Sequence, residues 1–188
     1  MKFTHEYLLK ILHYNPETGI FTWLKRPEFK DTLRTDRVWN AQNAGKQAGS
    51  VGPYGYLRIV ITFEDKVHYV GSHRLAWFYM TKEWPPADID HINLDIKDNR
   101  FCNLRLATRS QNNANAKPPR DNKSGKKGVF FDTSRQLWRM EIKCGNIRKA
   151  ARFPTFEEAC EARRRIAIEL FGEFAREQAG NKLAFLVY

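Results

Sequence analysis

Cysteine is scarce in this sequence, and long apolar runs are missing. The three cysteines, Cys102, Cys144 and Cys160, lie far apart, and they form no Cys-x-x-Cys pair. This spacing excludes a zinc finger, a zinc knuckle and a disulfide scaffold. The first ten residues lack the apolar core of a signal peptide, and no stretch resembles a membrane span. We therefore expect a soluble protein that stays in a reducing cytosol.

Acidic residues are few relative to basic ones. The chain of 188 residues has 32 Lys and Arg against 21 Asp and Glu, which gives a formal net charge of +11. Such a surplus indicates a polyanionic partner, nucleic acid above all. Anionic membranes are the competing polyanion, but the sequence has no basic amphipathic anchor. Hydrophobic residues make up 42%, enough for the packed cores of one or two domains.

Short helices and strands are predicted along the N-terminal half. Apolar spacing and turn residues predict a helix over residues 6–12, a strand over 20–24, a hairpin of 56–63 with 66–70, and a helix over 73–80 with Ser72 as its N-cap. Residues 26–47 are polar and basic, which favours a loop.

Two chemically capable residues, Asp90 and His91, interrupt a short apolar strand in the middle of the chain. A loop rich in Asn and Asp follows, and residues 104–106 form a second short strand. Thr108 and Gln111 have the spacing of a capping box, which predicts the start of a helix. The order is strand, loop, strand and helix, with Asn112 in the first full turn of the helix.

The C-terminal part reads as a separate small unit. Residues 117–127 are basic and contain prolines and glycine, which is typical of a linker. Three strands are predicted over residues 128–131, 137–143 and 147–153, and the middle one alternates apolar and polar residues as a half-buried strand does. Thr155 and Glu158 form a second capping box, so a helix should run from there to about Phe171.

Asp90, His91 and Asn112 could together hydrolyse a phosphodiester bond. A carboxylate and an amide oxygen suit a hard divalent cation that keeps open positions for phosphate and water. His91, with an ordinary pKa of about 6.5, could take a proton from an attacking water. Neighbouring strand residues point to opposite faces, so Asp90 and His91 can flank one phosphate only where the strand bends or ends. On the residues alone, an Asp-His pair of purely structural role remains an alternative.

Several segments resemble a family of phage HNH endonucleases. They are residues 14–23 (Tyr-Asn-Pro-Glu-Thr-Gly-Ile-Phe-Thr-Trp), 72–77, 83–85, 89–93, 98–100, 103–105 and 107–112. The last four resemble the ββα-metal core of homing endonucleases of the H-N-N type. The resemblance implies that Asp90 and Asn112 are metal ligands, that His91 is the general base, and that Asn103 fixes the loop and orients the base. Leu94 departs from the family pattern, which commonly has glycine there.

Two further polar residues are expected near this site. The family often has histidine at the position of His73, and we expect it to form a structural hydrogen bond or, as the alternative, to bind the metal. Asn115 shares a helix face with Asn112 and could contact phosphate or support Asn112 by a hydrogen bond.

The C-terminal unit resembles the ethylene-response-factor-type DNA-binding domain. The resemblance rests on residues 124–125, 127–129, 138–139, 153, 155–159 and 171–175. It implies that a three-stranded sheet enters the major groove. A generic solvated basic face is the alternative. The predicted DNA contacts, from linker and sheet, are Lys117, Arg120, Lys123, Lys126, Lys127, Arg135, Arg139, Lys143, Arg148, Lys149 and Arg152.

These observations predict an α+β protein with an N-terminal β-rich region, an HNH nuclease core and a C-terminal three-stranded antiparallel sheet plus helix. Residues 1–116 would form the nuclease part, with its core at about 72–116, residues 117–127 the linker and 128–188 the DNA-binding domain. A chain ending near Ala116 is then expected to nick DNA slowly.

The expected activity is that of a metal-dependent DNA endonuclease, a homing endonuclease, which leaves 5′-phosphate and 3′-hydroxyl ends. It would use one Mg²⁺ or Mn²⁺ ion and no zinc, and it would act on double-stranded DNA in the cytoplasm, that of a host cell if the chain is phage-encoded. One active site per chain favours a monomer that nicks, with a dimer as the alternative. A DNA-binding regulator with a decayed core and a binder of structured RNA are the competing functions.

Overall fold

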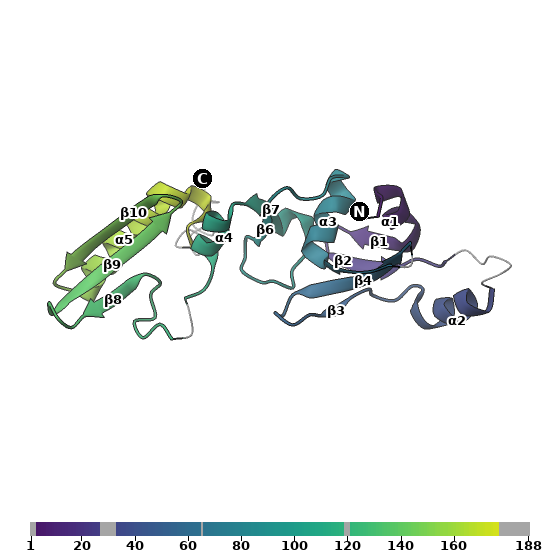
Figure 1. Ribbon diagram of the computed structural model, residues 1–188, viewed down its shortest axis with the longest axis horizontal. Helices are drawn as coiled ribbons and strands as arrows, with labels where there is room; N and C mark the ends of the chain where they lie inside the picture. The colour runs from purple at the N-terminus through teal and green to yellow at the C-terminus, as the bar shows by residue number, and fades with distance from the viewer. Residues whose placement is uncertain (1–2, 27–32, 65, 119–120, 177–188) are drawn as a thin grey trace, which may run out of the picture. The chain divides into compact units, whose positions relative to one another are not determined.

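The computed structural model describes residues 3–26, 33–64, 66–118 and 121–176. The chain forms two compact units, Met1–Leu106 and Ala107–Tyr188, and each is described by itself. Small antiparallel sheets and helices make up both units (Figure 1), which confirms the predicted α+β class. The division falls before the segment 117–127, whose role as a linker stays a prediction.

The first unit begins with a helix and a hairpin that pack on its core. Helix α1 (His5–Ile11) is capped by the Thr4 hydroxyl, which accepts from the Tyr7 N–H at 3.2 Å. Strands β1 (Leu12–Asn15) and β2 (Ile20–Trp23) pair through a turn that ends at Gly19 with φ +72°. A Cβ on Gly19 would lie 2.5 Å from the backbone of Asn99 and Arg100. Glycine is thus required at this position, because φ is positive and because the backbone of Asn99 and Arg100 leaves no room for a Cβ.

A second hairpin and a helix complete the core of this unit. Strands β3 (Ser50–Val51), β4 (Leu57–Phe63) and β5 (Lys66–Gly71) form one sheet, and α3 (Ser72–Thr81) follows directly. The hairpin is confirmed, but the N-cap prediction for Ser72 is wrong. Gly71 occupies the cap position, and Ser72 is the buried first residue of the helix.

The expected loop over residues 26–47 is also wrong, because it contains α2 (Leu33–Asn43). Contacts outside the helix hold it in place. The Asn40 side chain accepts from the Arg26 N–H at 2.8 Å and donates to the Arg26 carbonyl at 3.0 Å. The Arg26 guanidinium lies over the Trp39 ring at 3.8 Å, and Trp39 meets Trp23 edge to face. Such tertiary contacts override a weak local helix propensity.

The last elements of the first unit carry the candidate site. Strand β6 (Asp88–His91) pairs with β7 (Leu104–Ala107), and the intervening loop includes the 3₁₀ turn η1 (Phe101–Asn103). Both predicted strands are confirmed. Strand β6 ends at His91, as the hypothesis for Asp90 and His91 requires.

The second unit begins with α4 (Arg109–Asn115), whose predicted capping box at Thr108 is present. Strands β8 (Val129–Asp132), β9 (Leu137–Cys144) and β10 (Ile147–Phe153) form an antiparallel sheet in the order β10-β9-β8. Helix α5 (Phe156–Phe171), with the second capping box, lies along β9 and leads into η2 (Gly172–Phe174) (Figure 1). The predicted sheet and helix are therefore confirmed.

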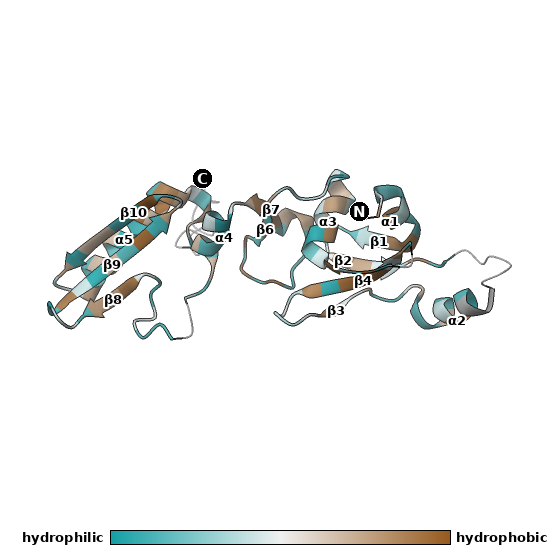
Figure 2. Cartoon of the chain, viewed as in Figure 1, coloured by the Kyte–Doolittle hydropathy of each residue, from teal (hydrophilic) through white to brown (hydrophobic). Residues whose placement is uncertain are grey.

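Alternation along the strands of this sheet gives it two different faces. Hydrophobic and hydrophilic residues follow one another along β9 (Figure 2), and Met140 and Ile142 are buried on the side of α5. Arg139 and Glu141 therefore point to the face without a helix. Within the described parts of the chain, no helix is both long and apolar enough to cross a bilayer.

Candidate active site

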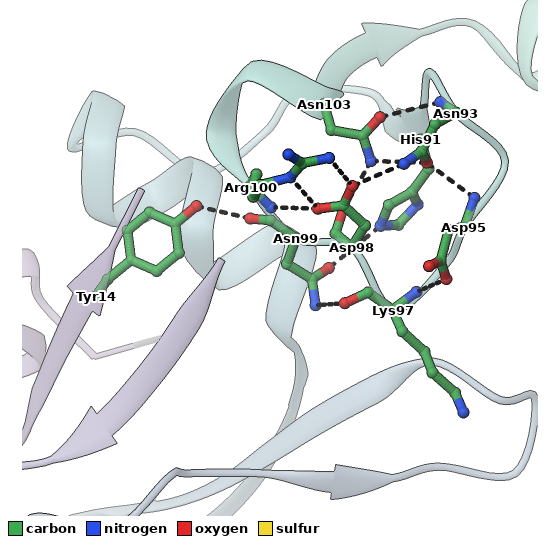
Figure 3. A network of polar contacts seen from close by, with 9 residues as sticks. All are labelled: Tyr14, His91, Asn93, Asp95, Lys97, Asp98, Asn99, Arg100 and Asn103. Carbon is green, nitrogen blue, oxygen red and sulfur yellow. Dashed lines mark hydrogen bonds and ion pairs between the residues drawn. The ribbon is translucent and has the colours of Figure 1, made fainter. Parts of the chain in front are cut away.

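The loop between β6 and β7 is held by side-chain hydrogen bonds (Figure 3). The Asn103 amide donates to the Asn93 side chain at 3.0 Å and to the Asp98 carbonyl at 2.8 Å, and its oxygen accepts from the Asn93 N–H at 3.0 Å. Arg100 binds both carboxylate oxygens of Asp98, which lowers the Asp98 pKa to about 2. Asn103 therefore fixes the loop, and its catalytic role stays a prediction.

Leu94 adopts a backbone conformation that favours glycine. Its φ is +66°, in the left-handed region that L-residues rarely adopt, and its N–H donates to the His91 carbonyl at 3.0 Å. The loop thus makes its tight turn directly after His91 with leucine at this position.

The ring of His91 is held by Asn99, a residue that the sequence interpretation missed. Both side chains are buried, and His91 Nε2 lies 3.2 Å from Asn99 Oδ1. Asn99 Nδ2 donates to the Lys97 carbonyl at 3.2 Å, which turns the amide oxygen toward the ring (Figure 3). With the amide oxygen toward the ring, Nε2 is the nitrogen that donates, and Nδ1 is the nitrogen at which a further proton would be accepted. Burial lowers the pKa of His91, so the ring is neutral at pH 7.

Asp90 forms a buried ion pair with Arg105 from the neighbouring strand. Arg105 Nη2 and Nε lie 2.8 and 2.9 Å from the same carboxylate oxygen, Oδ2, and the Asp90 side chain is 5% exposed. Arg105 was not among the predicted site residues. Its position on β7, the strand that pairs with β6, is the signal that could have identified it.

His73 lies next to His91, and its predicted structural hydrogen bond stays a prediction. The two ring centroids are 5.4 Å apart, and the Tyr56 ring lies near both in a tilted arrangement. Burial, with smaller contributions from His91 and Arg74, lowers the His73 pKa to about 4. Its Nδ1 is buried and has no hydrogen-bond partner among the described residues. His73 therefore packs against the candidate base as a neutral ring.

The predicted residues of α4 belong to the second unit. Asn112 is half-buried and Asn113 is exposed, whereas Asn115 is only 2% exposed. Asn113 also lines a cavity of about 640 Å³ within that unit. The structure thus brings Asp90, His91 and Asn103 together in the first unit and places Asn112 and Asn115 on the helix that opens the second.

The predicted DNA contacts of the sheet lie mostly on the face without a helix. Arg148 and Arg139 bind Glu141 at 2.7 and 3.0 Å, and β10 places Arg152 opposite Arg139. Lys149 differs, because it points to the other face and pairs with Glu169 of α5 at 2.7 Å. Its role as a DNA contact stays a prediction.

The remaining predicted contacts lie outside the sheet strands. Arg135 lies in the β8–β9 turn, 3.7 Å from the Asp132 carboxylate. Lys117, Lys123 and Lys126 are exposed, whereas the Lys127 amine binds backbone carbonyls of α4. Arg120 lies outside the described residues.

The donor atoms present suit a hard divalent ion better than zinc. Asp90 supplies a carboxylate and Asn112 an amide oxygen, which are ligands of the kind that Mg²⁺ and Mn²⁺ accept. Among the residues that the structure describes, no group of three or more His, Cys, Asp or Glu side chains could hold a metal ion. An ion held by either of these side chains would therefore need water and substrate oxygens to complete its coordination.

Comparisons with known proteins show which family this chain is similar to. A family model described as HNH endonuclease matches residues 70–114. "Protein 3.8" of Escherichia phage T7 is 34% identical over 88 residues, which cover 47% of this chain and 73% of the phage protein. The "Uncharacterized HNH endonuclease L560" of Acanthamoeba polyphaga mimivirus is 36% identical over 115 residues, 60% of this chain and 58% of the viral protein.

One solved structure, titled for DNA binding and cleavage by the HNH homing endonuclease I-HmuI, is 18% identical, with a TM-score of 0.39 over 81% of this chain and 76% of that one. This structural likeness is weak, whereas the sequence matches are direct. The chain therefore belongs to the HNH endonuclease family.

Proposed function

We propose that the protein is a metal-dependent DNA endonuclease of the homing type. It hydrolyses one phosphodiester bond at a time and leaves a 5′-phosphate and a 3′-hydroxyl. The observation that carries this proposal is the buried, neutral His91 at the end of β6, whose Nε2 lies 3.2 Å from Asn99 Oδ1. Asp90, a buried carboxylate, is adjacent to it in the chain.

The proposal assigns one role to each of these residues. His91 takes the proton of the attacking water at Nδ1, while Asn99 keeps the ring in one tautomer and orientation. Asp90 and Asn112 would hold the divalent ion, whose charge would stabilise the negative charge that develops on the phosphate and on the leaving oxygen. Arg105 holds the Asp90 carboxylate in place from the neighbouring strand.

The pH dependence of cleavage should report His91. A protonated ring cannot act as a base, so the rate constant should rise with pH as His91 loses its proton. Since burial lowers the pKa of His91, we expect the inflection below its ordinary value of about 6.5. Single-turnover rates between pH 5 and 8, with a constant free Mg²⁺ concentration, measure it. An inflection above pH 7 would contradict this assignment.

Asn112 should matter far more than Asn113 if its amide oxygen binds the metal. Adjacent helix positions are about 100° apart, so the two side chains cannot present an oxygen to the same ion. We expect Asn112→Ala to lower the cleavage rate by about two orders of magnitude, with Asn113→Ala as the matched control close to wild type. Single-turnover nicking assays compare the two variants. Equal losses would show that the metal ligand is assigned to the wrong residue.

DNA affinity should come largely from the face of the C-terminal sheet that has no helix. Lys143 and Arg148 are cross-strand neighbours on that face. Replacing both by alanine should make the slope of log affinity against log salt shallower by about 1.8, or about 0.9 for each phosphate that is no longer neutralised. The control variant, Arg164→Ala with Arg165→Ala, removes two charges from the exposed side of α5. Equal changes in the two double variants would indicate a generic basic surface.

A further inference from the structure

Helix α4, which carries Asn112, is bound at both of its ends by residues that follow it in the second unit. The Lys127 amine donates to the carbonyl of Asn113 and, at 3.5 Å, to that of Ala116. In the first turn, the Ser110 hydroxyl accepts from the Gly145 N–H of the β9–β10 turn at 3.3 Å. Both partners follow α4 in the chain and belong to the same unit.

Apolar packing fixes the helix between these two contacts. Ala107 is 2% exposed and lies in one cluster with Phe171 and Phe174, and Ala114 packs against the same cluster. A helix of seven residues is too short to be stable alone in water, because nucleation costs more than so few hydrogen bonds return. The order of α4 therefore depends on residues from Lys127 to Phe174.

The same contacts determine which side of α4 is left for other ligands. Ser110 and Ala114 are one turn apart, and both face the rest of the second unit, which contains Gly145 and the cluster of Phe171. Asn112 lies between them, about 200° around the helix from each. Its side chain therefore points away from the surface on which α4 is docked.

We propose that the C-terminal unit positions the metal-binding residue Asn112, in addition to binding DNA. Lys127 is the main positioning residue, because a cation at a helix C-terminus satisfies the last carbonyls and complements the helix dipole. This inference rests on the proposed function of Asn112. It also reverses one expectation from the sequence, since a chain that ends near Ala116 would lose the support of α4 and, with it, cleavage.

The test uses the full-length chain with Lys127→Met, and Lys126→Met as the matched control. Lys126 is exposed and adjacent, so its replacement removes the same charge without touching α4. Hydrogen exchange of the metal-free protein should be faster at the amides of residues 112–116 in Lys127→Met only. Mn²⁺ binding, followed by the electron paramagnetic resonance of the free ion, should weaken roughly tenfold. Lys127→Arg should restore both properties.

A double-mutant cycle separates this inference from the proposed function. In the Asn112→Ala background, Lys127→Met should cause no further loss of Mn²⁺ affinity, because Lys127 acts through that residue. If Asn112→Ala weakens Mn²⁺ binding but Lys127→Met behaves like Lys126→Met in both measurements, the positioning role is overturned and the metal site stands. If Asn112→Ala binds Mn²⁺ as the wild type does, the proposed metal ligand itself is wrong.

Discussion

Replacing His91 by alanine is expected to lower the rate of DNA cleavage by about two to four orders of magnitude, the usual effect of losing a general base. DNA affinity should stay at the wild-type level, because the buried ring offers no charge to the phosphates at pH 7. Single-turnover nicking measures the rate, and a gel-shift assay in EDTA measures the affinity. His13→Ala is a suitable control, since His13 is exposed on β1.

Excess metal should not rescue His91→Ala, because an additional ion does not replace the missing proton acceptor. Small exogenous bases such as imidazole are the appropriate rescue reagents, since they can take the proton from water in the vacated space. Undiminished cleavage by purified His91→Ala protein would contradict the assignment of His91 as the general base. A parallel loss of DNA affinity would instead indicate a structural role for the ring.

Asp90→Ala should slow cleavage by a different route. We expect a loss of at least about two orders of magnitude through weaker metal binding, with partial recovery in excess Mn²⁺. The variant should also unfold more easily, by about 3 kcal/mol, because the Arg105 guanidinium, which is only 12% exposed, loses its ion pair with Asp90. Chemical denaturation and Mn²⁺ titration of the cleavage rate measure the two effects separately.

A second substitution separates stability from activity at this ion pair. Asp90→Ala combined with Arg105→Leu removes both charges, so most of the lost stability should return while cleavage stays slow. A double variant that regains both stability and cleavage would show that Asp90 acts only as the partner of Arg105. It would then not be a metal ligand.

Local signals were enough to predict most of the elements. The capping boxes at Thr108 and Thr155 each begin a helix, and alternation along β9 correctly separates its buried face from its polar one. Helix α2 could not be found in this way, because Trp39 and Asn40 are ordered by contacts with residues outside the helix. Local propensity carries no information about such partners.

Of the candidate site, only the reactive groups Asp90 and His91 could be predicted from the sequence. Asp90 and His91 stand out in the sequence because they interrupt an apolar strand. Asn99 is one of several similar residues in an Asn- and Asp-rich loop, and only the fold shows which of them reaches the His91 ring. Arg105 likewise appears as an ordinary basic residue until the pairing of β6 with β7 brings it to Asp90.

The most direct test of the proposed function is one incubation of the purified full-length chain with supercoiled plasmid DNA. With Mg²⁺ or Mn²⁺ present, nicked circles should accumulate, and their ends should carry a 5′-phosphate and a 3′-hydroxyl. With EDTA, or with His91→Ala protein in either metal, the plasmid should remain supercoiled. Plasmid that stays intact with wild-type protein in both metals, although the protein binds it, would contradict the account and favour a DNA-binding regulator with a decayed nuclease core.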